Sequence, residues 1–225
     1  CPHIISRAEW GARAPTHPLQ TLPALPHYVF IHHGASGSCH TKADCTAMAK
    51  SYQNYHMDGR GYSDVGYNFL VGEDGNVYEA RGWDKVGGHT LHYNSVGIAI
   101  CVMGNFMDHP PNDAALNVIK NLINCGLSTH RLPANFVLKG HRDVGQTACP
   151  GQKLYDLIQT WPHYHLSTID HVLVNIEVAS SSLIVVIDFN LKVTRIASFP
   201  TVCGFALVPP ASPFPRIENW TSRYS

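Results

Sequence analysis

An almost continuous apolar run occupies the middle of the chain: Val96-Gly97-Ile98-Ala99-Ile100-Cys101-Val102-Met103-Gly104. A strand with one solvated face alternates apolar and polar residues, whereas a strand covered on both faces is apolar throughout. The run therefore predicts a central strand of a sheet that carries other elements on both of its faces. On this interpretation Cys101 is an inert thiol of the core.

Other strands are expected on either side of this run. Residues 27–33 are rich in β-branched and aromatic types and predict a buried strand. Residues 66–71 and 77–80 predict two short strands, which the turn sequence Glu-Asp-Gly-Asn at 73–76 joins into a hairpin. Residues 136–139 predict one more short strand.

Three main helices are expected between these strands. A capping-box pattern at residues 41–44 starts a helix that runs to about residue 57. Asn112 can cap a second helix, for which Gly126 is the expected end, and a third helix is expected after residues 150–151. Because strands and helices alternate, the sequence predicts an α/β fold, a central mixed β-sheet flanked by about three main helices.

A change in composition near residue 166 divides the chain. Residues 1–165 hold the predicted elements, together with a Pro-rich arm over residues 1–26 that Trp10 anchors, and they are expected to form a single domain. Residues 166–225 combine β-branched alternation with several prolines and one glycosylation sequon at Asn219. They are expected to be a C-terminal extension, and the sequence assigns no chemistry to them.

Composition bounds the class of protein. The 225 residues include sixteen basic and sixteen acidic side chains, and this zero net charge gives no support to a nucleic-acid partner. No apolar run reaches the ~18 residues of a membrane span, so none is expected. The first residue is Cys1 rather than Met, which is compatible with a removed secretory signal.

The seven cysteines bear on the redox compartment. Cys39 and Cys45 bracket a turn-rich segment, and a disulfide between them is typical of a secreted domain. In the alternative they are two free thiols of a cytosolic protein. The disulfide is favoured because exposed thiols are reactive, although the sequence alone does not fix how the cysteines pair.

One irregular, Gly- and Pro-punctuated segment carries two metal-binding side chains, His141 and Cys149, eight positions apart. Imidazole and thiolate are both good zinc ligands. A third ligand is expected from His32 or His33, at the end of the strand at residues 27–33. Neighbours on a strand point to opposite faces, so only one of the two can face the site. Three protein ligands leave one position open, which is typical of a catalytic zinc.

Separated motifs now give a family resemblance. They are Val29-Phe30-Ile31-His32-His33, the hairpin at residues 66–79, Arg81-Gly82-Trp83, Gly104-Asn105-Phe106 and Gly140-His141-Arg142-Asp143. Together and in this order they resemble a peptidoglycan recognition protein, of a family related to the phage-lysozyme type of zinc amidase. The resemblance covers roughly residues 1–165, and the extension lies outside it.

The resemblance implies a zinc ion on His32, His141 and Cys149, with His33 as the alternative first ligand. The implied reaction is hydrolysis of the amide between N-acetylmuramic acid and the L-alanine of the stem peptide. Zinc supplies an activated water and a polarised carbonyl for such a reaction. The implied partners are bacterial peptidoglycan and muropeptides.

The resemblance also implies residues that act on the substrate. It places the hydroxyl of Tyr67 near the developing oxyanion, which needs a hydrogen-bond donor. Thr147 occupies an assisting position, and a loop-capping hydroxyl is its equally weighted alternative. A groove for the sugar-peptide is expected from the helix end and the long loop at residues 82–94, with these candidates for substrate binding: His56, Gly61, Tyr62, Tyr78, Arg81, Trp83, His89, Thr90 and Asn94.

Stem-peptide specificity and disulfide pairing follow from the same resemblance. Gly61 and Arg81 match the pattern of members that prefer diaminopimelate stems, whose extra carboxylate suits a guanidinium. Tyr62 departs from that pattern, which has Trp there. The implied disulfides are Cys39–Cys45 and Cys1–Cys125, and Cys203 then has no partner inside the domain.

Two functions of different classes compete. One is a secreted zinc amidase of antibacterial innate immunity, and the other is a non-catalytic pattern-recognition protein that only binds peptidoglycan. Binding-only members typically lack the ligand cysteine or the first histidine, whereas this chain has both Cys149 and His32. The amidase is therefore favoured. A purely structural zinc site is disfavoured because such sites usually have four protein ligands.

Overall fold

The computed structural model describes residues 1–165, 173–178 and 181–186. The chain divides into two units, Cys1–Asp170 and His171–Ser225. In the second unit, β7 (Leu173–Val178) and β8 (Ser181–Val186) pair as an antiparallel two-stranded sheet. Cys203 and the sequon at Asn219 lie outside the described residues, and the separate extension stays a prediction.

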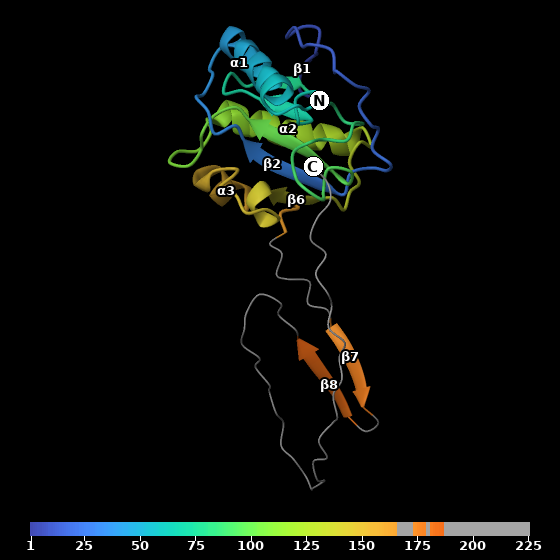
Figure 1. Cartoon of the computed structure of the whole chain (residues 1–225). Helices are drawn as coiled ribbons and strands as arrows, with labels where there is room; N and C mark the ends of the chain where they lie inside the picture. Colours follow the sequence, from blue (N-terminus) through green and yellow to red (C-terminus); the bar gives the residue numbers. More distant parts are fainter. Residues whose placement is uncertain (166–172, 179–180, 187–225) are drawn as a thin grey trace. The chain divides into compact units, whose positions relative to one another are not determined.

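A six-stranded mixed sheet forms the centre of the first unit (Figure 1), and its order is β1-β4-β3-β5-β2-β6. The predicted central strand is β5, which is buried along its whole length and lies between β3 and β2. All pairs are parallel except the β3–β4 hairpin, which confirms the mixed sheet. The strands are β1 (Ile4–Ile5), β2 (Tyr28–His33), β3 (Phe69–Val71), β4 (Val77–Glu79), β5 (Gly97–Val102) and β6 (Val137–Gly140).

The N-terminal arm contains a strand that the sequence did not predict. β1 has only two residues, too few for an alternating pattern to be visible, and it pairs in parallel with β4 at the edge of the sheet. The predicted anchor, Trp10, is fully buried, and its Nε1–H donates to the carbonyl of Glu79 at 2.7 Å. The arm is therefore tied to the sheet through β4.

Helices cover both faces of the sheet, as predicted. α1 (Lys42–Asn54) continues as a π-helical turn (Tyr55–Gly59), while α2 (Asp113–Ser128) and α3 (Gln152–Ile158) follow later in the chain. Ile100 of β5 belongs to one buried cluster with residues of α2 and α3. Its neighbour Cys101 belongs to a second cluster with Ala49 of α1. Period-2 alternation along β5 thus divides the core into two layers.

The predicted end of the second helix is wrong. α2 runs through Gly126 and ends at Ser128. A Cβ atom at Gly126 would lie 2.7 Å from Cη2 of Trp83 and 2.9 Å from Cδ1 of Leu132. The glycine is therefore needed for close packing under the helix rather than for its termination. The start was correct, because the side chain of Asn112 accepts a hydrogen bond from the N–H of Ala115.

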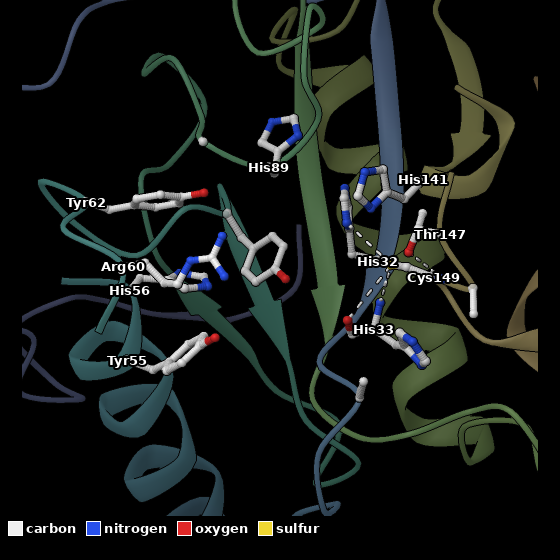
Figure 2. A pocket seen from close by; sticks show the side chains of 14 residues that line it. His32, His33, Tyr55, His56, Arg60, Tyr62, His89, His141, Thr147 and Cys149 are labelled. Atoms are coloured by element: carbon white, nitrogen blue, oxygen red, sulfur yellow. Dashed lines mark hydrogen bonds between the residues drawn. The ribbon is translucent and has the colours of Figure 1, made fainter. Parts of the chain in front are cut away.

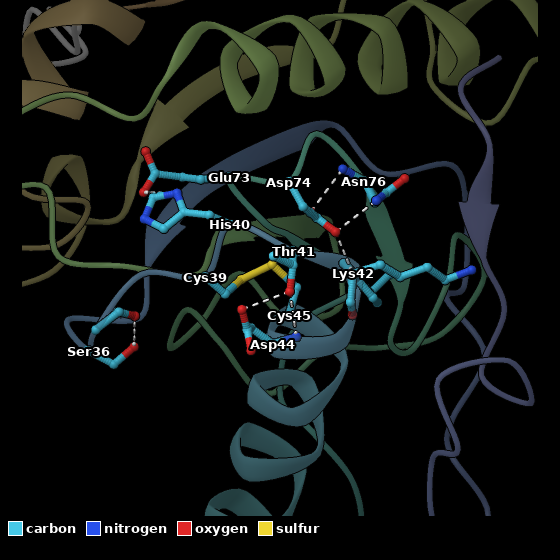
Figure 3. The surroundings of a disulfide bond; sticks show 12 residues. Ser36, Cys39, His40, Thr41, Lys42, Asp44, Cys45, Glu73, Asp74 and Asn76 are labelled. Atoms are coloured by element: carbon cyan, nitrogen blue, oxygen red, sulfur yellow. Dashed lines mark hydrogen bonds and ion pairs between the residues drawn. A yellow bond between two sulfur atoms is a disulfide. The ribbon is translucent and has the colours of Figure 1, made fainter.

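Both implied disulfides are present. Cys39–Cys45 links the segment before α1 to the first turn of this helix, next to the hydroxyl of Thr41 that caps it (Figure 3). Cys1–Cys125 links the N-terminal arm to α2. Among the described residues, Cys101 and Cys149 remain as buried free thiols. No helix in the described part of the chain has the length and apolar character required to cross a bilayer.

Asn68 connects the sheet to the long loop that follows β4. Its Nδ2 donates to the carbonyls of Gly82 at 2.8 Å and Lys85 at 3.0 Å, and its Oδ1 accepts from the N–H of Ala99 at 2.9 Å. The side chain is fully buried. Since its amide satisfies three backbone groups, Asn68 fixes the path of residues 82–94 relative to β5.

We expect Asn68→Ala to lower the free energy of unfolding by about 2–4 kcal/mol, because three backbone groups lose their partner in the interior. Urea denaturation of the full chain measures the change. The matched control is Asn117→Ala on the exposed face of α2, for which we expect a change below about 0.5 kcal/mol. Equal effects of the two substitutions would contradict this role of Asn68.

Candidate metal centre and its cavity

A cavity of about 390 Å³ opens at one edge of the sheet. β2 and β6 are parallel neighbours, so their carboxyl ends meet at this edge. β2 ends in His32-His33, and His141 follows β6 directly. Figure 2 shows His32, His141 and Cys149 together on one side of the cavity, with His56 and Tyr62 on the opposite side.

The three predicted ligands converge. One nitrogen each of His32 and His141 and the sulfur of Cys149 all lie within 4.8 Å of one another. Nδ1 of His32 is 3.5 Å from Sγ of Cys149. A tetrahedral zinc with bonds of about 2.0–2.1 Å to nitrogen and 2.3 Å to sulfur separates such ligand atoms by about 3.6 Å. The donor set and the spacing of His32 and Cys149 therefore fit zinc.

His32 and His33 point to opposite faces, as strand geometry requires. His32 pairs in register with Cys101 on the α1 side of the sheet, and His33 pairs with Val102 on the side of α2 and α3. Nδ1 of His33 accepts the N–H of Phe106 at 3.3 Å. The backbone N–H of His33 donates to Sγ of Cys149 at 3.4 Å, so His33 supports the cysteine through its main chain.

Burial sets the protonation of the three ligands. It lowers the pKa of His32 well below its ordinary value and lowers the pKa of His141, so both imidazoles are neutral near pH 7 and keep a lone pair. Burial raises the pKa of Cys149 to about 12, against the opposing effects of the His33 N–H and Arg142. The free sulfur is therefore a thiol, and a metal ion must displace its proton.

The loop that carries Cys149 is held by local hydrogen bonds. The hydroxyl of Thr147 accepts the N–H of Cys149 at 3.1 Å, and the carbonyl of Cys149 accepts the N–H of Arg142 at 3.0 Å. Asp143 accepts hydrogen bonds from the hydroxyls of Tyr155 and Tyr164. Thr147 also lines the cavity, so both roles considered for it are compatible with its position.

Tyr67 lies next to the metal-binding group. Its ring centroid is 5.3 Å from that of His32 and 5.4 Å from that of His56, and it lines the cavity. Burial raises the pKa of the phenol well above its ordinary value, and the sulfurs of Cys101 and Cys149 add to this effect. The phenol thus keeps its proton near pH 7 and can act as a hydrogen-bond donor.

Three of the predicted groove residues line the cavity: His56, Tyr62 and His89. Nδ1 of His56 accepts the N–H of Gly66 at 2.8 Å. Burial, assisted by Arg81, lowers the pKa of His56 to about 4, and burial lowers that of His89 to about 3. Both rings are therefore neutral near pH 7, and the wall is polar without being charged at these positions.

Two of the expected groove residues lie elsewhere, which corrects the prediction. Tyr78 is fully buried on the α1 side of the sheet, where its hydroxyl donates to Asp74 at 2.6 Å. Trp83 packs on Phe69, with ring centroids 4.7 Å apart, and under Gly126. Residue type suggested an aromatic wall, but Tyr78 points into the core and Trp83 packs half-buried against it.

The remaining four candidates lie just outside the cavity lining. Arg81 donates to the carbonyls of Val65 and Val86, each at 2.7 Å, so its guanidinium braces the loop. Asn94 and the buried Thr90 shape the same loop, as described below. Gly61 has φ +68° and open space around its Cβ position. These residues support the cavity wall rather than form it.

Tyr55 and Arg60 also line the cavity, a position that their sequence pattern does not predict. Both lie at the π-helical end of α1, opposite the metal-binding group (Figure 2). The sequence signalled only that a helix ends at these positions. The exposed side chain of Tyr55, 59% accessible, is visible only in the structure, so the residue pattern held no separate signal for these two residues.

The sequence and the fold also match known proteins. Residues 21–152 match the family described as N-acetylmuramoyl-L-alanine amidase. Peptidoglycan recognition protein 1 of Bos indicus is 46% identical over 165 residues, which are 73% of this chain and 86% of that protein. Peptidoglycan recognition protein 3 of Mus musculus is 43% identical over 164 residues, 73% of this chain. The chain spans about half the length of that relative, 47%.

A solved structure gives the same fold. It is peptidoglycan recognition protein-LE in complex with tracheal cytotoxin, described as monomeric diaminopimelic acid-type peptidoglycan. The two share 39% sequence identity with a TM-score of 0.72, over 73% of this chain and 96% of that one. The family match and these relatives together show that this chain belongs to the peptidoglycan recognition protein family and contains its N-acetylmuramoyl-L-alanine amidase-type domain.

Proposed function

We propose that this chain is a zinc-dependent N-acetylmuramoyl-L-alanine amidase that cleaves the amide between N-acetylmuramic acid and L-alanine in peptidoglycan. The observation that carries the proposal is the convergence of His32, His141 and Cys149 at an open cavity. Cys149 is free for a metal because the disulfides of the described residues leave it unpaired. Three ligands and an accessible cavity suit a catalytic rather than a structural site.

The chain supplies the groups that such a hydrolysis needs. A zinc ion held by these ligands would activate a water and polarise the amide carbonyl. Tyr67 keeps its phenolic proton and lies beside His32, so it can donate to the oxygen that gains negative charge. The neutral rings of His56 and His89 can bind the amides and hydroxyls of a sugar-peptide from the wall.

The proposed ligand is a bacterial muropeptide, with preference for diaminopimelate stems. A guanidinium is the natural partner of the extra carboxylate of this stem. Arg81 has five N–H groups, and the backbone carbonyls of Val65, Val86 and Asp64 take three of them. Its Nη2 would lie 3.6 Å from a Cβ at Gly88, which lines the cavity. Because Gly88 has no side chain, a ligand carboxylate that lies against Gly88 in the cavity would come close to Arg81.

We further infer that the protein acts outside the cell, in antibacterial innate immunity. Its two disulfides, Cys1–Cys125 and Cys39–Cys45, are typical of an oxidising compartment. The names of the relatives describe recognition of peptidoglycan, which supports peptidoglycan as the ligand of this chain. They leave a non-catalytic binder as the second candidate function, and the presence of all three metal ligands favours the amidase over it.

The first test is the release of free stem peptide from a defined muramyl peptide. We expect release by the full chain with zinc, loss of release with a chelator, and recovery when zinc is restored. Cys149→Ser should reduce release to background, since it removes one of three ligands. Cys101→Ser, at the other buried free thiol, is the matched control and should keep zinc-dependent release.

Binding of the same muropeptide without release, in zinc-loaded protein, would contradict the amidase proposal and leave the recognition function. Calorimetric titration with the muropeptide separates the two outcomes, because it measures binding independently of cleavage.

Tyr67→Phe tests the proposed oxyanion donor. We expect kcat to fall by about 10²–10³-fold, the usual effect of removing one such donor, with little change in zinc affinity. Steady-state kinetics together with a zinc titration measure both. Such a donor usually lowers the activation free energy by about 2.7–4 kcal/mol. A kcat of Tyr67→Phe within twofold of the wild type would therefore contradict a role of Tyr67 as this donor.

Arg81→Ala tests the stem-peptide preference. Hydrogen bonds to charged groups contribute about 1.5–3 kcal/mol, so the ratio of affinities for diaminopimelate-type over lysine-type muropeptides should fall about tenfold or more. Arg60→Ala, at an arginine that lines the cavity, serves as the comparison. If the ratio of affinities falls in Arg60→Ala alone, Arg60 rather than Arg81 sets the preference. If the ratio is unchanged in both variants, neither arginine sets a preference for diaminopimelate stems.

A further inference from the structure

The hydroxyl of Thr90 lies between two imidazoles of the site. Oγ1 of Thr90 is 3.1 Å from Nε2 of His32 and 2.9 Å from Nδ1 of His89. Thr90 is 1% exposed and does not line the cavity. Its position is thus behind the metal-binding group rather than in contact with a ligand in the cavity.

The backbone of the loop fixes this hydroxyl. Oδ1 of Asn94 accepts the N–H groups of His89 at 2.8 Å and Thr90 at 2.9 Å. The carbonyl of Thr90 accepts the N–H of Tyr93 at 3.0 Å. Because β-branched Thr90 has few χ1 rotamers and its backbone is held on both sides, the hydroxyl has little freedom to leave the two rings.

Two arrangements donate the hydroxyl proton of Thr90 to a ring nitrogen, and the nitrogens of His32 and His89 are the partners that Oγ1 has among the described residues. A neutral imidazole has one N–H and one lone pair, and a hydroxyl has a single proton to donate. In the first arrangement, Nε2–H of His32 donates to Thr90, and Thr90 donates to Nδ1 of His89. In the second arrangement, each bond runs in the opposite direction.

Only the first arrangement is compatible with a metal at the candidate centre. It leaves the lone pair of His32 on Nδ1, the nitrogen that lies 3.5 Å from Sγ of Cys149. The second arrangement puts a proton on Nδ1, between the ring and the metal position. The second nitrogen of a metal-bound histidine ordinarily donates its N–H to a supporting acceptor, which orients the ring.

The first arrangement also determines the state of His89. Its Nδ1 accepts the bond from Thr90, so its Nε2 carries the proton. This Nε2 is buried and has no hydrogen-bond partner among the described residues. A single hydroxyl thus sets the orientation of both rings.

We propose that Thr90 is a positioning residue for the metal centre: its hydroxyl holds His32 in the tautomer that offers Nδ1 to zinc. Thr90 therefore acts through His32 and does not bind the substrate, in contrast to its assignment to the groove. This inference rests on the proposed zinc site.

The test compares zinc affinity of the full chain with that of two Thr90 variants, by competition with a chromophoric chelator. Thr90→Val keeps the shape but removes the hydroxyl, and we expect zinc to bind about 10–100-fold more weakly. Thr90→Ser keeps the hydroxyl and should restore most of the affinity. Thr160→Val is the control. It removes an exposed hydroxyl just after α3, which donates to the carbonyl of Leu157, and should leave zinc affinity unchanged.

A second measurement needs no variant. Nitrogen-15 NMR of the zinc-loaded wild type should place the remaining imidazole proton of His32 on Nε2. Equal zinc affinity of the wild type and a folded Thr90→Val variant, or a proton on Nδ1, would overturn the role of Thr90. If the wild type binds zinc and releases stem peptide while Thr90→Val binds zinc equally well, only this inference fails. If the wild type binds no zinc, the proposed function fails with it.

Discussion

The parallel pairing of β2 with β5 and β6 is the constraint on which the candidate site depends. Parallel register brings the carboxyl ends of β2 and β6 to one edge of the sheet, and so it brings His32 next to His141. Because of the pleat, the His32 ring points toward His141 and Cys149, while the His33 ring accepts the N–H of Phe106 on the other side, although His33 also borders the cavity. A register shift of one residue would turn His32 away from Cys149 and place a neighbouring residue of β2 in its position.

Two irregular segments complete what the sheet begins. The loop after β6 presents Cys149, and the N–H of His33 donates to its sulfur, so the strand supports both its own ligand and the distant one. The loop after β4 is attached to the sheet through the amide of Asn68 and reaches His32 through Thr90. The interior of the protein and its metal-binding group are therefore joined by a few buried, satisfied hydrogen bonds.

Most of the fold follows from sequence patterns. The apolar run at residues 96–104, the hairpin and the capping residues Thr41 and Asn112 predict elements that the structure contains. β1 was missed because two residues carry no periodic signal, and Gly126 was misread because packing against Trp83, not helix termination, requires it.

For the site, residue types and the family resemblance identified His32, His141 and Cys149, which the structure brings together. The groove was harder to predict. Tyr78 has the right residue type, but the pleat directs it into the core, while Arg60 reaches the cavity from the π-helical end of α1. Side-chain direction in irregular segments depends on tertiary contacts that local patterns do not encode.

The central claim is that two imidazoles and one thiolate of this chain bind a single zinc ion with a position open to solvent. X-ray absorption spectroscopy of the zinc-loaded full chain tests it most directly. The account predicts one sulfur at about 2.3 Å and a shell of nitrogen and oxygen at about 2.0–2.1 Å, with the sulfur contribution lost in Cys149→Ser. A zinc environment without sulfur, or with the same sulfur contribution in that variant, would contradict it.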